Sequence, residues 1–307
     1  MNAICPVCIR ACPPGRSFCG RRDAGGNLIV PNTYQALRTD RLFDKPLIHY
    51  ADNLKVLSLG SWGCNLRCLG CQNARLSWTT TGHELESLRL GPREAAAYAL
   101  AQGCRGLCYT FNEPAILLES VTETAAEAKA AGLRNILVTN CTLTVASAGR
   151  IGTQMDAVAA DIKSMEDGFY YEYCGAEGIA DVARKILDCI RAFREAGCHL
   201  EVRTNVIPGA NDQDGNFEAI AGWIIKELGQ DVPWHITRFF PAHYLGHLPA
   251  TPAATILRAQ RIGRAMGLAH VNAFLSKGCD CATDVCFING DRTSGEASLN
   301  DCCSDRS

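Results

Sequence analysis

Three features that would assign this chain to a particular class of protein are missing from its sequence. No apolar run reaches the roughly 18 residues that a transmembrane helix needs. The formal net charge is −2, so there is no basic excess of the kind that favours nucleic acid as the main partner. The N-terminal residues lack the charged segment and long apolar stretch of a secretory signal. We therefore expect a cytoplasmic protein that binds neither a membrane nor, as its main partner, nucleic acid.

Cysteine, in contrast, is abundant, with 18 residues in a chain of 307. In a small secreted protein such a count would indicate disulfides. Because a secretory signal is missing, the spacings are better explained as metal ligands in a reducing compartment. The hydrophobic share of 47% and the charged share of 20% describe an ordinary globular core. A chain of this length suits one α/β barrel or two smaller domains.

From about residue 54, strand-like apolar runs alternate with helical segments, which is typical of parallel strands joined by right-handed crossovers. Strands are predicted at 54–60, 106–111, 135–139, 157–162, 200–207, 234–239 and 269–274. Helices are predicted at 92–102, 115–131, 180–196, 217–228 and 252–266. This order predicts an α/β fold, a partial (βα)6 barrel, whose functional loops lie at the carboxyl ends of its strands.

Cysteine-rich segments precede and follow the predicted barrel, which spans residues 51–276. Residues 1–50 are rich in Cys, Pro and Gly, and we expect them to fold around a metal or against the barrel. Residues 277–307 are polar, Cys-rich and poorly periodic, so we expect this tail to be partly disordered.

The most informative motif is a run of three cysteines directly after the first predicted strand. Cys64, Cys68 and Cys71 are spaced Cys-x3-Cys-x2-Cys. A 4Fe-4S cluster has four irons, and each is normally held by one cysteine thiolate. Three thiolates from one loop leave one iron open to another ligand, as catalysis at a cluster requires. The alternative is buried or zinc-binding cysteines, but zinc loops usually supply paired Cys-x2-Cys units with four ligands.

This loop resembles the signature of the radical S-adenosylmethionine (SAM) superfamily. The resemblance implies that SAM chelates the open iron and that an electron from the cluster cleaves it, giving a 5′-deoxyadenosyl radical that abstracts hydrogen from a substrate. The cluster and SAM then supply the difficult chemistry, while the protein binds, orients and excludes water. One position departs from the pattern, since the residue before the third cysteine is usually aromatic and is Gly70 here.

Polar residues end the run 109–114, which follows the second predicted strand. In the superfamily a Gly-Gly-Glu-like segment at this place receives the ammonium group of SAM, and Asn112 and Glu113 match its polar end. A carboxylate is suitable chemistry for a cation. The resemblance therefore implies that both residues bind the cofactor. A helix N-cap followed by a first-turn acid is the alternative.

Charged residues mark two further strands. Related activating enzymes carry an Asp-Leu-Lys close to SAM, and Asp161 and Lys163 match its two charged positions. They also carry an arginine for the SAM carboxylate ahead of a Pro-Gly pair, and Arg203 matches it; a guanidinium fork suits that group. A surface ion pair and a solvent-facing strand arginine are the respective alternatives.

The sixth predicted strand, 234–239, alternates so that His235, Thr237 and Phe239 share one face. If this face points into the barrel, His235 contacts substrate or adenosine. A lone histidine in a strand is otherwise more often a satisfied core residue.

Together these segments resemble one radical SAM family, that of the AmmeMemoRadiSam system, a relative of pyruvate formate-lyase activating enzyme. The resembling segments run in the family's order and cover most of residues 1–275: 45–49, 57–60, 63–73, 109–114, 161–163, 207–212 and 233–241. Two places depart from it, since Cys141 follows Asn140 where relatives have Gly, and 271–274 lacks the usual Gly-Asn. The resemblance leaves the physiological substrate open.

The N-terminal segment also matches that family through four closely spaced cysteines: Cys5, Cys8, Cys12 and Cys19. Four thiolates suffice for tetrahedral zinc or for a second iron–sulfur cluster. Structural zinc fits a small segment without its own core, whereas an auxiliary cluster fits electron transfer or substrate anchoring. Both remain open, with unmetallated thiols as a third possibility. If the two ends of the chain meet, further thiols complete or replace the set: Cys279, Cys281 and Cys286.

The sequence is thus interpreted as a radical SAM enzyme with a 4Fe-4S cluster and SAM as cofactors. Its expected partners are a reductant such as flavodoxin or ferredoxin and an unidentified substrate, either a protein or a small molecule. One alternative is a glycyl-radical enzyme activase of the pyruvate formate-lyase activating type. Another is a non-catalytic iron–sulfur electron carrier, which explains the cysteines but leaves Asn112, Glu113 and Arg203 without a purpose.

Overall fold

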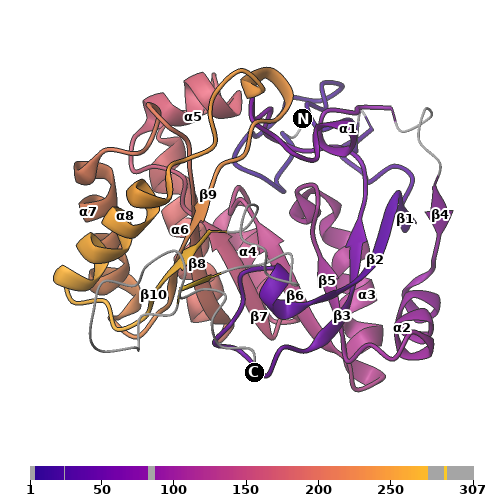
Figure 1. The fold of residues 1–307 in the computed structure, drawn as a ribbon. Coiled ribbons are helices and arrows are strands. Elements are labelled where there is room, and N and C mark those ends of the chain that lie inside the picture. The colour runs from indigo at the N-terminus through magenta and orange to yellow at the C-terminus, as the bar shows by residue number, and fades with distance from the viewer. Residues whose placement is uncertain (1–3, 24, 82–86, 276–286, 289–307) are drawn as a thin grey trace.

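One sheet forms the frame of the computed structural model, which describes residues 4–23, 25–81, 87–275 and 287–288 (Figure 1). In this part of the chain nine strands pair in the order β11-β10-β9-β8-β7-β6-β5-β3-β2. Seven neighbours run parallel: β3 (Lys55–Gly60), β5 (Gly106–Tyr109), β6 (Arg134–Thr139), β7 (Ala157–Asp161), β8 (His199–Val206), β9 (Trp234–Arg238) and β10 (Val271–Phe274). These are the seven predicted strands, which confirms an α/β fold with a mostly parallel sheet, as in a partial barrel.

Antiparallel strands flank the parallel ones. β2 (Ala36–Arg41) pairs with β3, and β11 (Phe287–Ile288) pairs with β10. A separate pair joins β1 (Thr33–Tyr34) to β4 (Leu88–Arg89). Because β2 belongs to the predicted N-terminal segment 1–50, that segment contributes a strand to the main sheet.

Helices connect the strands and pack on the outer face of the sheet (Figure 1). Five of the longer ones match predicted helices: α2 (Pro92–Ala101), α3 (Leu118–Ala130), α6 (Val182–Glu195), α7 (Asp214–Trp223) and α8 (Ala253–Ala265). A 3-10 turn, Pro114–Leu117, precedes α3, and a π-helical turn, Ile224–Leu228, follows α7. Shorter 3-10 turns cover Leu42–Asp44 and His243–Leu245, and α1 (Ala74–Ser77) follows the cysteine loop.

Besides the four-residue α1, two helices were not predicted from the sequence, α4 (Val145–Gly152) and α5 (Asp167–Cys174). The sequence of α4, VASAGRIG, contains two glycines, and that of α5, DGFYYEYC, is rich in aromatic residues. Both compositions have low helix propensity. Tertiary packing stabilises these helices instead, since residues such as Ile151 and Tyr170 are buried in the main core.

The strands are buried on both faces, as expected for a parallel sheet. All five residues of β7 are buried, and alternate residues face two different apolar clusters. The inner cluster is closed by residues that precede β3, and its fully buried members include Leu42, Leu47, Val56 and Ile136. The segment 42–54 thus fills the inside of the barrel opposite the carboxyl ends of the strands.

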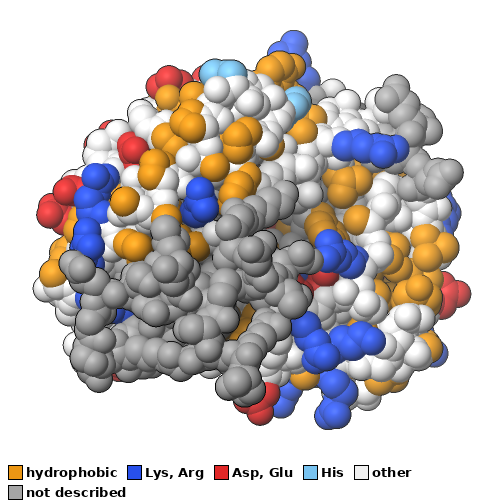
Figure 2. Space-filling view, viewed as in Figure 1, with side chains coloured by type: hydrophobic (Ala, Val, Ile, Leu, Met, Phe, Trp, Pro, Cys, Tyr) orange, Lys and Arg blue, Asp and Glu red, His pale blue; other side chains and the backbone are white. Residues whose placement is uncertain are grey.

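No helix in the described residues is long and apolar enough to cross a membrane. On the face shown in Figure 2, Lys and Arg side chains stand in small separate groups, and most of the Asp and Glu side chains lie toward the margins. This distribution is consistent with the small net charge of −2.

Candidate functional site

A cavity of about 240 Å³ opens at the carboxyl ends of the parallel strands. Its walls come from the segments that leave five of them, β3, β5, β6, β7 and β8. Seven of the predicted site residues line it: Cys64, Cys68, Cys71, Asn112, Asp161, Lys163 and Arg203. The topology therefore brings together residues that are up to about 140 positions apart in the sequence, at the edge where barrels of this kind carry their function.

The cysteine loop is held in place by hydrogen bonds to α5. The amides of Arg67 and Leu69 donate to the carbonyls of Cys174 (2.8 Å) and Tyr173 (2.9 Å). Within the loop, the Arg67 guanidinium donates to the carbonyls of Cys64 (2.7 Å) and Leu66 (3.0 Å). Because these bonds fix the backbone on both sides of Cys68, the three thiols are presented to the cavity by a preorganised loop.

Gly63 and Gly70 are required in this loop for steric reasons. Gly63 has a φ of +86°, and a Cβ there would lie 2.5 Å from the carbonyl oxygen of Cys19. A Cβ at Gly70 would lie 2.8 Å from the ring of Phe239, which is 2% exposed. The absence of an aromatic residue at position 70 thus has a physical reason, because an aromatic ring from the end of β9 already fills that space.

The cavity thiols are protonated when no metal is bound. Burial raises the pKa of Cys64 and of Cys71. The pKa of Cys68 is raised first by its interaction with the Cys174 thiol and then by burial. Since metals bind the thiolate, loading this site must release protons.

Four thiols line the cavity, and the three that come from one loop, Cys64, Cys68 and Cys71, are a donor set that fits an iron–sulfur cluster. Among the described residues, no group of three or more His, Cys, Asp or Glu side chains is arranged to hold a single metal ion. In a cluster each thiolate binds a different iron, so the three cysteines need not meet at a single ion.

Opposite the cysteines, one carboxylate pairs with two cations. Asp161 accepts hydrogen bonds from Lys163 Nζ (2.6 Å) and Arg203 Nε (2.5 Å). Burial alone would raise the pKa of Asp161, but the charges of Arg203 and Lys163 outweigh it and lower this pKa to about 2. The group carries a net positive charge at neutral pH, so it can receive an anionic group such as a carboxylate.

Asn112 and Glu113 occupy different environments. Asn112 lines the cavity, accepts from the amide of Ser61 (3.1 Å) and donates to the carbonyl of Gly63 (2.9 Å). Glu113 is fully buried and does not line the cavity. Its carboxylate accepts from the amides of Ala115 (3.1 Å) and Asn140 (2.7 Å) and from Thr139 Oγ1 (2.8 Å). Glu113 therefore caps the turn before α3 and holds the end of β6.

His235 lies below the cavity, fully buried, and does not line it. Its Nε2 is 2.5 Å from Oε2 of Glu201, and its Nδ1 is 3.2 Å from Nδ2 of Asn272. Glu201 also accepts from the amides of Ile48 (3.0 Å) and His49 (2.9 Å). In this structure His235 is thus the satisfied core histidine of the alternative interpretation, and its network ties the segment 42–54 into the barrel.

Several cavity residues were not singled out from the sequence. Asn140 and Asn205 supply amide groups, while Tyr173 and Cys174 come from α5, which was not predicted. Asn205 donates to the carbonyl of Arg238 (2.9 Å) and so links β8 to β9. The alternation along β8 could have identified Asn205, because it lies two residues after Arg203 on the same face.

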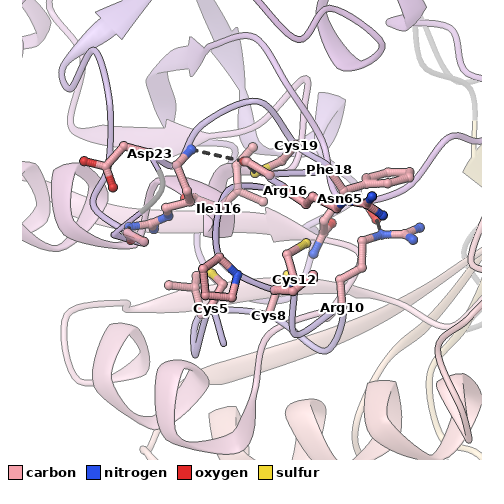
Figure 3. A pocket seen from close by; sticks show the side chains of 16 residues that line it. Cys5, Cys8, Arg10, Cys12, Arg16, Phe18, Cys19, Asp23, Asn65 and Ile116 are labelled. Atoms are coloured by element: carbon pink, nitrogen blue, oxygen red, sulfur yellow. Dashed lines mark hydrogen bonds between the residues drawn. The ribbon is translucent and has the colours of Figure 1, made fainter. Parts of the chain in front are cut away.

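The four N-terminal cysteines of the predicted second set line a separate cavity (Figure 3). The backbone closes a loop here, since the Cys5 amide donates to the Cys12 carbonyl (2.9 Å). The backbones of Cys8 and Leu143 pair in an isolated antiparallel β-bridge. This pairing holds the loop against the segment that follows β6. The C-terminal cysteines that were considered as additional ligands, Cys279, Cys281 and Cys286, lie outside the described residues.

The chain is similar to known proteins over most of its length. Residues 61–218, just over half of the chain, match the model of the radical SAM superfamily. Uncharacterized protein MJ0808 of Methanocaldococcus jannaschii is 29% identical over 276 residues, covering 87% of this chain and 79% of the relative.

Two solved structures show a similar fold. The structure of TYW1 with a lysine–pyruvate adduct bound aligns with a TM-score of 0.54 at 14% identity, covering 85% of this chain and 91% of the other. A radical SAM methyltransferase from Sphaerobacter thermophilus aligns with a TM-score of 0.51 at 17% identity, covering 71% and 66%. At these identities the likeness concerns the fold alone.

Proposed function

This chain belongs to the radical SAM superfamily, and we propose that Cys64, Cys68 and Cys71 hold a 4Fe-4S cluster whose fourth iron binds SAM. When bound, the cluster and SAM supply one chemistry, the reductive cleavage of SAM to a 5′-deoxyadenosyl radical that abstracts hydrogen from a substrate. The observation that carries the proposal is that the three thiols share one cavity with Asn112 and with the charged group of Asp161, Lys163 and Arg203.

The charged group gives this cavity a place for the methionine part of SAM. Arg203 donates to Asp161 through Nε, at one edge of the guanidinium, which leaves the terminal nitrogens available for a carboxylate. Lys163 adds a second positive charge beside the same carboxylate of Asp161. We therefore assign the SAM carboxylate to the side of the cavity formed by β7 and β8.

The ammonium group of SAM is assigned to the opposite side. Glu113, to which the resemblance gave this role, has both carboxylate oxygens engaged with the ends of β5 and β6. Asn112 and the loop at Asn140 lie on the cavity wall instead. In this proposal Glu113 is a positioning residue, which holds the amide of Asn140 at 2.7 Å and so shapes the wall that the ammonium group meets.

The narrower relationship to the AmmeMemoRadiSam family, and through it to glycyl-radical activases, remains part of this proposal. It rests on the order of the motifs and not on the solved structures, whose likeness concerns the fold alone. A reductant such as flavodoxin or ferredoxin, a cytoplasmic location and a protein or small-molecule substrate follow from the same proposal. Function on this fold is decided by the site, and the cavity residues do not encode the acceptor of the radical.

The test is an assay of 5′-deoxyadenosine release. The protein is purified without oxygen, reconstituted with iron and sulfide, reduced with dithionite and supplied with SAM. Release that requires both SAM and reductant supports the proposal. A fully loaded and reduced cluster that leaves SAM intact would favour the electron-carrier alternative.

A further inference from the structure

The N-terminal cavity brings together four thiols that the proposed SAM chemistry does not use. Cys5, Cys8, Cys12 and Cys19 all line it, and Cys8 and Cys19 are buried. Figure 3 shows Cys8 and Cys12 side by side, with Cys5 beside them and Cys19 on the opposite wall. Loops instead of helices or strands present all four, and such loops commonly enclose a metal.

Arginine side chains without a carboxylate partner lie next to the segments that carry these thiols. Arg10 donates to the carbonyls of Asn65 (2.8 Å) and Gly175 only, and its guanidinium lies 3.4 Å from the centre of the Phe18 ring. Arg67 likewise bonds only to carbonyl oxygens and stacks on the same ring at 4.6 Å. These statements hold for the described residues, among which neither arginine forms a salt bridge.

Arg21 is a third arginine without a carboxylate partner among the described residues, and it is the most deeply buried of the three. It is fully buried, follows Cys19 by two positions and packs on Trp62 at 4.1 Å. One guanidinium nitrogen donates to the carbonyl of Val30 (2.9 Å), while Nε and Nη1 have no hydrogen-bond partner among the described residues. A buried cation with unmet donors is unfavourable unless an anion lies nearby. The neighbouring Arg22 differs, because it pairs with Glu119 at 2.7 Å.

We propose that Cys5, Cys8, Cys12 and Cys19 bind a second metal centre as thiolates, and that this anionic centre balances Arg10, Arg21 and Arg67. Tetrathiolate zinc and a cysteine-ligated iron–sulfur cluster share this chemistry. Neither cysteine set is arranged to hold a single ion in the described residues, so the side-chain positions alone do not select zinc.

The second centre is in direct contact with the loop that presents the SAM-cluster thiols. Arg10 binds the carbonyl of Asn65, and Arg67 binds the carbonyl of Phe18 (3.0 Å). The Phe18 ring lies against both guanidinium groups, and Gly63 approaches the backbone of Cys19 closely enough to exclude a side chain. The N-terminal site and the loop that carries Cys64 are therefore packed directly against each other.

The test removes the SAM cluster and asks whether metal remains. The variant Cys64→Ala/Cys68→Ala/Cys71→Ala is prepared without oxygen, offered zinc or iron with sulfide, and analysed by mass spectrometry for metals and by a sulfide assay. Retention of about one zinc per chain, or of about four irons with sulfide, supports the proposal and identifies the centre. A metal-free variant with the circular dichroism of the wild-type protein would overturn it. This outcome is independent of whether the wild-type protein cleaves SAM.

A second measurement uses the wild-type chain, in case the triple variant does not fold. Alkylation with iodoacetamide is followed by peptide mass spectrometry before and after treatment with a chelator. Protection of the four cysteines that is lost with the metal supports the site, and alkylation at the same rate in both states overturns it. Cys8→Ser/Cys12→Ser should lower the metal content by the amount found in the triple variant. The matched control Cys104→Ser/Cys198→Ser, two buried cysteines outside both sets, should not.

Discussion

The ring of Phe239 occupies the space directly above Gly70, although the two residues are 169 positions apart in the sequence. A Cβ at position 70 would approach the ring to 2.8 Å and Leu245 to 3.2 Å. The cysteine loop and the segment that follows β9 therefore pack closely, with no room for a side chain at position 70. The aromatic group that the superfamily pattern leads one to expect in the loop is contributed by a different strand.

This relationship predicts a coupled pair of substitutions. Gly70→Ala should lower the free energy of unfolding by about 1–3 kcal/mol, because the added methyl group overpacks the contact with Phe239. In Gly70→Ala/Phe239→Leu the smaller side chain leaves room for that methyl group. A double-mutant cycle from urea unfolding should give a favourable coupling of at least about 0.5 kcal/mol. If the effects of the two substitutions on the free energy of unfolding simply add, the two residues are not in contact.

The cluster assignment predicts the behaviour of Cys68→Ala. This variant should lose the iron of the SAM cluster and release 5′-deoxyadenosine only at the level of a control without enzyme, since one iron loses its thiolate. Cys104→Ala, at a buried cysteine outside both cavities, should retain both properties. Iron analysis and product quantification check the pair. Full activity in Cys68→Ala would refute the cluster assignment.

The assignment of the SAM carboxylate predicts a weaker complex in Arg203→Lys. Lysine keeps the charge but loses the planar fork, so SAM should bind roughly 10-fold more weakly, which corresponds to about 1.4 kcal/mol. Arg184→Lys, at an exposed position on α6, is the matched control and should bind SAM like the wild-type protein. Isothermal titration of the reconstituted proteins measures both. Unchanged affinity in Arg203→Lys would place the carboxylate elsewhere.

The Glu201 network predicts how stability depends on pH. Burial would raise the pKa of Glu201, but hydrogen bonds and charge interactions with His199 and His235 outweigh it and lower this pKa from 4.5 to about 2. Since the folded-state pKa is the lower one, the carboxylate stabilises the fold fully above about pH 4.5. This contribution is lost as the pH falls toward 2. Its upper limit is about 3 kcal/mol.

Glu201→Gln tests that contribution. The variant should be less stable at neutral pH and should lose less stability than the wild-type protein between pH 4.5 and pH 3, as measured by urea unfolding. Glu195→Gln, a substitution of the same kind at the exposed end of α6, serves as the control. If the free energy of unfolding falls equally for the wild type and Glu201→Gln between pH 4.5 and pH 3, carboxylates other than Glu201 cause the loss of stability in this range.

The strands and most of the cavity could be predicted from sequence because they depend on local patterns. Apolar runs mark parallel strands. Asp161 and Arg203 were identified because they match charged positions of related activating enzymes, and both stand on strands whose carboxyl ends meet at one edge of the sheet. Their bonding could not be predicted in the same way. Glu113 turns toward Thr139 and Asn140, and these partners are recognised only in three dimensions.

His235 and Phe239 illustrate the same limit on one strand. Alternation placed both on one face, but it could not show that Glu201 engages His235 or that Phe239 packs on Gly70. α5 was missed because its aromatic residues have low helix propensity, although its carbonyls support the cysteine loop. Contacts between distant segments decided each of these cases. The roles of the site residues remain predictions that the experiments above address.

The segment 42–54 packs inside the barrel and gives the cavity a closed floor. Val138 lines the cavity and also belongs to the buried layer that contains Leu42 and Leu47, so within the described residues packed side chains lie beneath the cavity. Under the proposed function, SAM and substrate are expected to enter at the carboxyl ends of the strands. A substrate bound there would lie over SAM, so SAM is expected to bind first and to leave last.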